Sequence, residues 1–212
     1  MSRLHHMALP KTVLAALLAV TALPSLARAV DFTPDEIARL KAGKVVRQEL
    51  PSSRKGGFYG GSGFAVVDAP VDVVWRALQD WGAYTKIFPN TTETTELSRK
   101  GGRSLIRMRL GHPIVSVVYH VEMSRDEAKK VLSFELVPDL PHDLDGVRGY
   151  WRLFPQADNR TLVAYVVAIN APMGLVNLAG PDLSARAIHA LLGVPGYVKK
   201  WVEGEGRSRY IH

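Results

Sequence analysis

The sequence predicts an α+β domain in which a curved antiparallel β-sheet carries a long C-terminal helix across its concave face. Three observations lead to this prediction. Apolar residues recur at helical spacing after residue 70, alternate with polar residues between residues 91 and 170, and return to helical spacing after residue 182. A helix laid across a curved sheet leaves a space between the two layers, so we expect an internal cavity filled by side chains or by a ligand.

The composition of the 212 residues excludes several classes of protein. Apolar residues make up 47% of the chain, which argues against disorder. Cysteine is absent, which excludes disulfide scaffolds, thiolate zinc sites, iron–sulfur clusters, thiol catalysis and the lipid-bearing cysteine of bacterial lipoproteins. We expect no metal site and no cofactor.

Residues 1–29 have the pattern of a cleaved signal peptide. Arg3 and Lys11 make the start basic, residues 12–23 are apolar apart from two threonines, and residues 27–29 read Ala-Arg-Ala. A membrane anchor is the alternative, but this apolar run is shorter than the about 20 residues that a spanning helix needs. We therefore expect a mature chain that starts at Val30 and is periplasmic or secreted.

The mature chain is mildly basic. Removal of residues 1–29 lowers the formal net charge from +7 to +4. This excess is compatible with transient contact with an anionic membrane surface, and it is too weak to indicate a nucleic-acid partner.

The first elements expected are a short helix and two strands. Thr33 can cap a helix that starts at Pro34, and Glu36 completes a capping box. Residues 45–50 and 58–67 are expected as strands, joined by an exposed connection. Several glycines in and before the second of these strands resemble a phosphate loop, but no helix follows them, so we expect a bulged or closely approached strand.

A helix is expected from Pro70, because Val71, Val74 and Leu78 recur at helical spacing, and residues 84–89 follow on a bend. The period then changes to two, as in strands with one apolar face. Residues 161–169 are apolar on both faces, so we place that strand centrally. The inward-facing positions are Ile106, Met108, Leu110, Val115, Val117, Tyr119, Val121, Met123, Leu132, Phe134 and Leu136.

The last helix is expected to present one apolar stripe, interrupted by Gly193, Pro195 and Gly196. The segment before it, residues 171–180, is apolar where a polar turn is usual. It can be buried filler, a mobile gate over a lipid site or a membrane-touching loop. Segments 173–180 and 193–196 are the parts of the cavity cover that we expect to open most easily. The stripe consists of Leu183, Ala187, Leu191, Val194, Val198 and Trp201.

Three motifs accompany this order of elements. Residues 63–75 read GFAVVDAPVDVVW, residues 81–89 read WGAYTKIFP, and residues 149–155 read GYWRLFP. Together with the closing helix they resemble the START-like, helix-grip (SRPBCC) superfamily, which includes polyketide cyclases and coenzyme-Q-binding proteins, over residues 58–201. The resemblance implies a helix-grip fold and the binding of apolar small molecules under the C-terminal helix, with catalysis in a minority of members.

The resemblance also divides the chain. After the signal peptide, residues 30–57 form a leader with a short helix that the minimal domain lacks. Residues 58–204 form the START-like ligand-binding domain, and residues 205–212 form a C-terminal tail.

The expected ligand-binding residues lie where the sheet and the last helix face each other. His189 lies one position off the helical stripe, where it can pack or contact a ligand. The set is Met108, Val117, Tyr119, Phe134, Trp151, Met173, Leu175, His189 and Leu191.

Catalytic candidates are weak. His120 and Glu122 lie side by side on the polar face of one strand, either as a general-base pair or, as we favour, as an outward-facing, hydrogen-bonded pair. Tyr150 is a third candidate. We therefore expect the protein to bind, and to transport, a hydrophobic small molecule such as a lipid, quinone, sterol-like terpenoid or fatty acid, with a cyclase- or hydrolase-type enzyme as the alternative.

Two charged sets have plainer interpretations. Four arginines lie on neighbouring strands and could bind an anion together. The apolar residues next to them in sequence are expected to point inward, so we favour the outer face for the arginines. They are Arg107, Arg109, Arg148 and Arg152. Residues 139–145 hold several acidic side chains in a pattern that matches no complete calcium loop, so a hydrated hairpin loop is favoured.

Overall fold

The fold was analysed in a computed structural model, which describes residues 31–50, 57–111 and 116–211. The chain divides into two compact units, Met1–Thr33 and Pro34–His212, and the second is described below. The predicted signal peptide, the cleavage before Val30 and most of the predicted connection before residue 58 lie outside the described residues.

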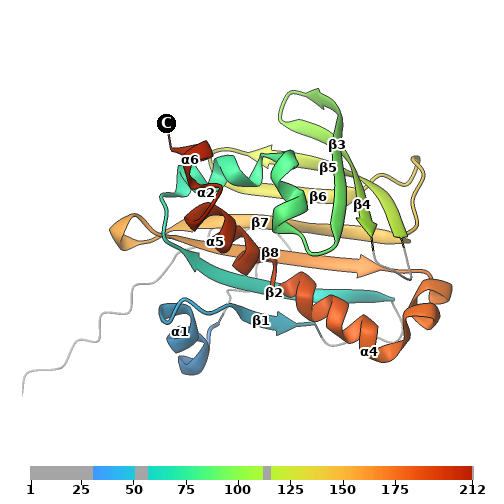
Figure 1. Cartoon of the computed structure of the whole chain (residues 1–212), viewed down its shortest axis with the longest axis horizontal. Helices are drawn as coiled ribbons and strands as arrows, with labels where there is room; N and C mark the ends of the chain where they lie inside the picture. The colour runs from blue at the N-terminus through green and yellow to red at the C-terminus, as the bar shows by residue number, and fades with distance from the viewer. Residues whose placement is uncertain (1–30, 51–56, 112–115, 212) are drawn as a thin grey trace, which may run out of the picture. The chain divides into compact units, whose positions relative to one another are not determined.

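Eight strands of the described residues form one antiparallel sheet in the order β1-β2-β8-β7-β6-β5-β4-β3 (Figure 1). Strands β3 to β8 follow one another across the sheet, and β2 lies against β8. The strand predicted to be central is β8, which pairs with β2 on one side and β7 on the other. The strands are β1 (Val46–Glu49), β2 (Phe58–Val67), β3 (Thr91–Lys100), β4 (Arg103–Gly111), β5 (Ser116–Asp126), β6 (Val131–Leu136), β7 (Gly146–Pro155) and β8 (Thr161–Asn170).

One face of this sheet, called the inner face here, packs against most of the helices. Inward-facing residues such as Ile106 and Leu153 share one hydrophobic core with Trp75, Leu78 and other buried helix residues. These helices are α2 (Val71–Leu78), the 3-10 turn η1 (Trp81–Ala83), α3 (Tyr84–Ile87), α4 (Met173–Leu192) and α5 (Val194–Glu203). The helix α1 (Pro34–Lys41) lies beside β1 and β2 (Figure 1), and the 3-10 turn η2 (Ala157–Asn159) joins β7 to β8.

The register of the sheet brings distant inward-facing side chains together. Met108 lies opposite Tyr119, Met123 opposite Phe134, and Trp151 opposite Tyr165. Because side chains alternate between faces along a strand, these pairs all point to the inner face. The two-residue period of the sequence therefore predicted the correct face for the described residues of β4, β5 and β6, whereas Val115 lies outside the described residues.

The C-terminal region differs from the predicted single helix after residue 182. Helix α4 already starts at Met173, directly after Pro172, so the apolar segment predicted as a connection is helical instead. Met173, two leucines and Ala179 favour helix in this segment, and Pro172 is tolerated at a helix start. At Gly180 the φ angle is 73°, and Pro181 follows without a backbone donor, so α4 is broken there.

The predicted interruption at Gly193 and Pro195 is confirmed. Helix α4 ends at Leu192, and α5 begins at Val194 with Pro195 in its first turn, where the missing N–H costs nothing.

Residues predicted as a tail include a further helix, α6 (Arg207–Tyr210), whose Tyr210 is buried. Within the described residues no helix is both long and apolar enough to cross a membrane.

The glycines of β2 permit close contacts on both sides. A Cβ atom at Gly63 would lie 2.1 Å from the carbonyl oxygen of Leu192, where α4 ends. At Gly60 and Gly61, whose φ angles are 154°, a Cβ would lie 1.9 Å and 2.2 Å from neighbouring strand carbonyls. The interpretation of this glycine cluster as a closely approached strand is therefore confirmed.

We predict that Gly63→Ala lowers the free energy of unfolding by about 2–3 kcal/mol, because the backbone of Leu192 must move away from β2. Urea unfolding followed by circular dichroism measures this. The matched control is Gly174→Ala in α4, where an added Cβ meets nothing within 4 Å and stability should be unchanged or slightly higher. Equal stability of the two variants would contradict the contact.

Candidate functional site

A cavity of about 540 Å³ lies between the inner face of the sheet and α4. Strands β4 to β8, with Tyr59 of β2, supply one wall, α3 and the residues after it a second, and α4 the third. Its lining is mostly aliphatic and aromatic, which is typical of sites for apolar small molecules. The residues that contribute most of the apolar wall are Tyr84, Phe88, Met108, Leu110, Val117, Tyr119, Val121, Met123, Phe134, Leu144, Val147, Trp151, Tyr165, Val167, Ile169, Leu175, Leu183, Ile188 and Leu191.

The structure brings seven of the nine predicted ligand-binding residues to this cavity. The seven are Met108, Val117, Tyr119, Phe134, Trp151, Leu175 and Leu191. Met173 and His189 are not among its lining residues: Met173 is 66% exposed, and the backbone carbonyl of His189 accepts a hydrogen bond from Arg47 Nε at 3.1 Å. Contact of the seven residues with a ligand stays a prediction.

A cluster of five aromatic rings forms part of the wall. The rings of Trp151 and Tyr165 lie 4.2 Å apart, and Phe88 contacts both at 6.0 Å and 6.1 Å. Tyr84 lies 4.9 Å from Phe88, and Phe134 stacks on Tyr165 at 6.0 Å. Such offset and edge-on pairs make a rigid apolar wall.

Three of these aromatic residues were missed at the level of sequence. Tyr165 lies in a strand that is apolar on both faces, so alternation gave no direction for its side chain. Tyr84 and Phe88 come from the short helix α3 and its end, which the sequence indicated only as a bend. The pairing of Trp151 with Tyr165 across β7 and β8 is the signal that would have found the cluster.

The buried polar groups of the wall are neutral. Burial raises the pKa of Tyr84, Tyr119 and Tyr165, so their hydroxyls keep their protons. Tyr84 Oη donates a hydrogen bond to the carbonyl of Leu78 at 2.9 Å, whereas Trp151 Nε1 is buried with no hydrogen-bond partner in the described part of the chain. These groups can donate hydrogen bonds, and none of them is a strong base at neutral pH.

The three catalytic candidates lie outside the cavity. His120 is buried under the loop that follows β6, and its Nδ1 donates to the carbonyl of Pro141 at 2.8 Å. Glu122 is exposed and faces Arg103 at 3.5 Å, and Tyr150 lies half-buried on the outer face of β7. No hydrogen bond joins His120 to Glu122 among the described residues. Both residues lie on the outer face, as we favoured, but the hydrogen bond that we expected between them is replaced by the one from His120 to Pro141.

The four arginines that could have clamped an anion lie on the outer face. Glu93 on β3 holds two of them, Arg107 at 2.6 Å and Arg109 at 3.2 Å. The Arg148 guanidinium lies 4.7 Å from the ring centre of Phe58, and that of Arg152 lies 4.8 Å from Phe154. The favoured interpretation of these arginines as surface residues is confirmed.

The side chain and the backbone amide of Asp143 hold the acidic loop against β5. Asp143 Oδ2 accepts a hydrogen bond from the Val118 amide at 2.7 Å, and the Asp143 amide donates to the Val118 carbonyl at 2.8 Å. No group of three potential metal-ligating side chains occurs among the described residues.

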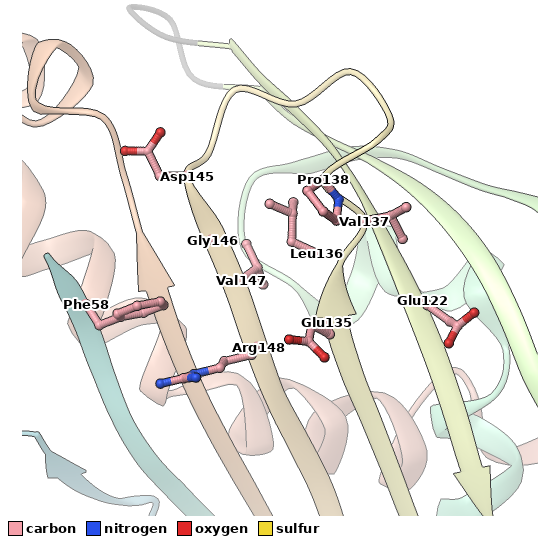
Figure 2. Close-up of a pocket in the computed structure, with 10 residues that line it drawn as sticks. All are labelled: Phe58, Glu122, Glu135, Leu136, Val137, Pro138, Asp145, Gly146, Val147 and Arg148. Atoms are coloured by element: carbon pink, nitrogen blue, oxygen red, sulfur yellow. The ribbon is translucent and has the colours of Figure 1, made fainter. Parts of the chain in front are cut away.

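A second hollow of about 510 Å³ lies at the outer face, beside this loop (Figure 2). Glu122, Glu135 and Arg148 occupy facing positions on three adjacent strands, β5, β6 and β7. Figure 2 shows Arg148 extending toward Phe58 and Glu135 standing beside it. Of the predicted site residues, this hollow contains only Glu122.

The curved open sheet with C-terminal helices held over a cavity is the helix-grip α+β fold of START-like proteins, as predicted. The chain belongs to the polyketide cyclase / dehydrase and lipid transport family, whose model matches residues 62–193. No curated protein matches the sequence.

Solved structures with this fold are distant in sequence. The Zhui aromatase/cyclase from Streptomyces sp. R1128 is 20% identical with a TM-score of 0.55, covering 69% of this chain and 97% of that one. A STAR-related lipid transfer protein from Xanthomonas axonopodis is 17% identical with a TM-score of 0.51, covering 74% and 98%. A START superfamily protein from Mycobacterium smegmatis is 16% identical with a TM-score of 0.50, covering 66% and 96%.

We predict that alkaline pH destabilises the protein because of the buried tyrosines. Their pKa is raised in the folded state, so the unfolded chain, with a tyrosine pKa near 10, releases its protons first. The contribution of these tyrosines to the free energy of unfolding is fully present below pH 10. It falls as the pH rises, by about 1 kcal/mol per buried tyrosine between pH 10 and pH 11.

Urea unfolding at both pH values measures this loss. Tyr165→Phe should reduce it by about 1 kcal/mol relative to wild type, whatever its effect at pH 8. An unchanged loss would mean that the Tyr165 hydroxyl ionises in the folded protein and that water fills this part of the cavity.

Proposed function

We propose that the protein binds a hydrophobic small molecule, of the lipid, quinone, sterol-like terpenoid or fatty acid class, in the 540 Å³ cavity and carries it between membranes. The observation that carries the proposal is the contrast between α4 and the wall opposite it. Of the 20 residues of α4, only Leu192 is buried, while Leu183, Ile188 and Leu191 face the cavity half-exposed. An apolar ligand between α4 and the sheet would cover these side chains.

Apolar burial supplies the affinity in this proposal. Each 100 Å² of apolar surface removed from water contributes about 2.5 kcal/mol. The cavity volume lies within the range of about 300–1,000 Å³ that is usual for small-molecule sites. The tyrosine hydroxyls on the wall offer a few neutral hydrogen bonds that can orient the ligand.

A cyclase- or hydrolase-type enzyme has less support. Among the described residues that line the cavity there is no His, Asp or Glu, and the hydroxyl pKa of Tyr119 and Tyr165 is raised. General-base catalysis at neutral pH favours a group with a pKa near the operating pH. We therefore propose binding in preference to catalysis.

The binding test uses Nile red, a neutral apolar dye whose fluorescence rises in apolar surroundings. Lipid-stripped wild-type protein should bind it, and Val117→Trp, which places an indole in the cavity, should weaken binding about tenfold or more. Fluorescence titration measures both dissociation constants.

The matched control is Val118→Trp, since Val118 is the next residue of β5 and points to the outer face. It should bind Nile red like wild type. If Val117→Trp fails to fold, Leu191→Trp on α4 replaces it, because Leu191 lines the same cavity half-exposed. Equal binding by the cavity and control variants would contradict the proposed site.

We propose that the chain is exported and cleaved before Val30. The basic start, the apolar run and the Ala-Arg-Ala sequence of residues 27–29 support this. Transient contact with an anionic membrane surface fits Met173 and Leu178 of α4, which are 66% and 63% exposed.

The full chain expressed in a Gram-negative host should be recovered from the periplasm with Val30 as its first residue. N-terminal sequencing of the periplasmic fraction measures this. Recovery of protein that still begins at Met1 in the cytosol would contradict export.

A further inference from the structure

One charged side chain stands at the edge of an otherwise neutral cavity. Among the described residues that line it, Arg186 of α4 is the only one with a full charge. Arg186 is exposed, so it stands where the cavity meets solvent. The other non-aromatic polar residues of the lining, Asn90 and Ser184, are also partly or fully exposed.

The Arg186 guanidinium has no hydrogen bond and no ion pair in the part of the chain that the structure describes. Asp182 precedes it by one helical turn, at a spacing that often forms an ion pair, yet no ion pair joins these two described side chains. Other arginines of the chain pair with carboxylates: Arg99 with Glu96, and Arg107 and Arg109 with Glu93. Among the described residues, none of the five N–H donors of Arg186 has a partner.

The wall of the cavity that faces α4 is aromatic and carries no charge among its described residues. Trp151 and Tyr165 of the aromatic cluster are buried, and an anion there would lose its hydration and meet only neutral donors, such as Trp151 Nε1, with no opposite charge. A ligand with one anionic end therefore favours the orientation with its apolar body against the aromatic cluster and its charged end at Arg186.

We infer that the ligand is amphipathic, with an apolar body and one anionic end, a carboxylate or a phosphate, which Arg186 binds at the edge of the cavity. This inference rests on the proposed function and specifies the ligand class of the same site. The guanidinium plane can donate two parallel hydrogen bonds to two oxygens of such a group. A neutral ligand of equal length would leave those donors to water.

The test compares three compounds with the same twelve-carbon chain for displacement of Nile red: dodecanoate, dodecyl phosphate and 1-dodecanol. Nile red is neutral, and its dissociation constant is measured first for each variant so that the three compounds are compared relative to it. At least one of the two anions should displace Nile red from the wild-type protein at about one-tenth of the concentration that dodecanol needs. This ratio is expected for a charge-assisted contact open to solvent. The two anions distinguish a fatty acid carboxylate from a lipid phosphate.

Arg186→Gln should remove this preference, bringing the anions within about twofold of dodecanol when all three are referred to that variant's own Nile red dissociation constant. Arg186→Lys should keep part of it, because the positive charge remains and the planar fork is lost. The matched control is Arg103→Gln, the same change of charge at an exposed arginine on the outer end of β4, which should leave all displacement curves unchanged.

The outcomes separate the two proposals. If dodecanol and the anions displace Nile red equally from wild type, or if Arg186→Gln keeps the anion preference, the inference about Arg186 is wrong and the apolar binding site stands. If Nile red does not bind and none of the three compounds is taken up, the proposed function is wrong, and the ligand class falls with it.

Discussion

The backbone contact between β2 and the end of α4 determines where a cavity can exist in this domain. Gly63 allows the Leu192 carbonyl to approach β2 so closely that no Cβ would fit between them. From that point the C-terminal chain runs in two directions along the inner face, α5 on one side and α4 on the other (Figure 1). Val194, Val198 and Val202 of α5 are fully buried, whereas α4 is buried only at Leu192. The cavity lies between the sheet and α4, the less buried of the two helices.

Polar contacts also attach α5 to β2 and to α6. Lys199 Nζ donates to the Val66 carbonyl of β2 at 2.9 Å and pairs with Glu203 at 2.6 Å. Trp201 Nε1 donates to Tyr210 Oη, which in turn donates to Asp80 at 2.8 Å, so α6 is fixed between α5 and the end of α2. Charge-assisted and partly buried hydrogen bonds of this kind are stronger than exposed neutral ones. One end of the helical layer is therefore firmly attached, and the site lies at the other.

The sequence predicted those parts of the site that depend on local periodicity. Strands with one apolar face, such as β4 and β5, placed Met108 and Tyr119 correctly, because alternation alone fixes the face. A strand apolar on both faces carries no such information, and Tyr165 was missed for that reason. His120 alternates as an outer-face residue, yet it is buried because the loop after β6 folds over β5. Burial of that kind depends on a distant segment, which a strand's own pattern does not contain.

Helix α4 shows a different limit of sequence interpretation. An apolar stripe counts only apolar positions, so Arg186, adjacent to the stripe residue Ala187, was passed over although it lines the same cavity. The start of α4 was taken for a connection because glycines at positions 174 and 180 and Pro181 weaken the helical signal. In the structure, Gly180 and Pro181 interrupt α4 within its length and do not mark either of its ends.

The two segments expected to open the cavity are not equivalent in the structure. Residues 193–196 lie at the attached end: a Cβ at Gly193 would lie 2.7 Å from Arg47 Nη2, and Val194 is fully buried. Opening there would expose core residues and separate α5 from β2. Residues 173–180 lie before the break at Gly180, and they include two of the exposed apolar side chains, Met173 and Leu178. Local opening costs least where few apolar contacts are lost, so ligand exchange is expected at this end of α4, next to the surface proposed to touch a membrane.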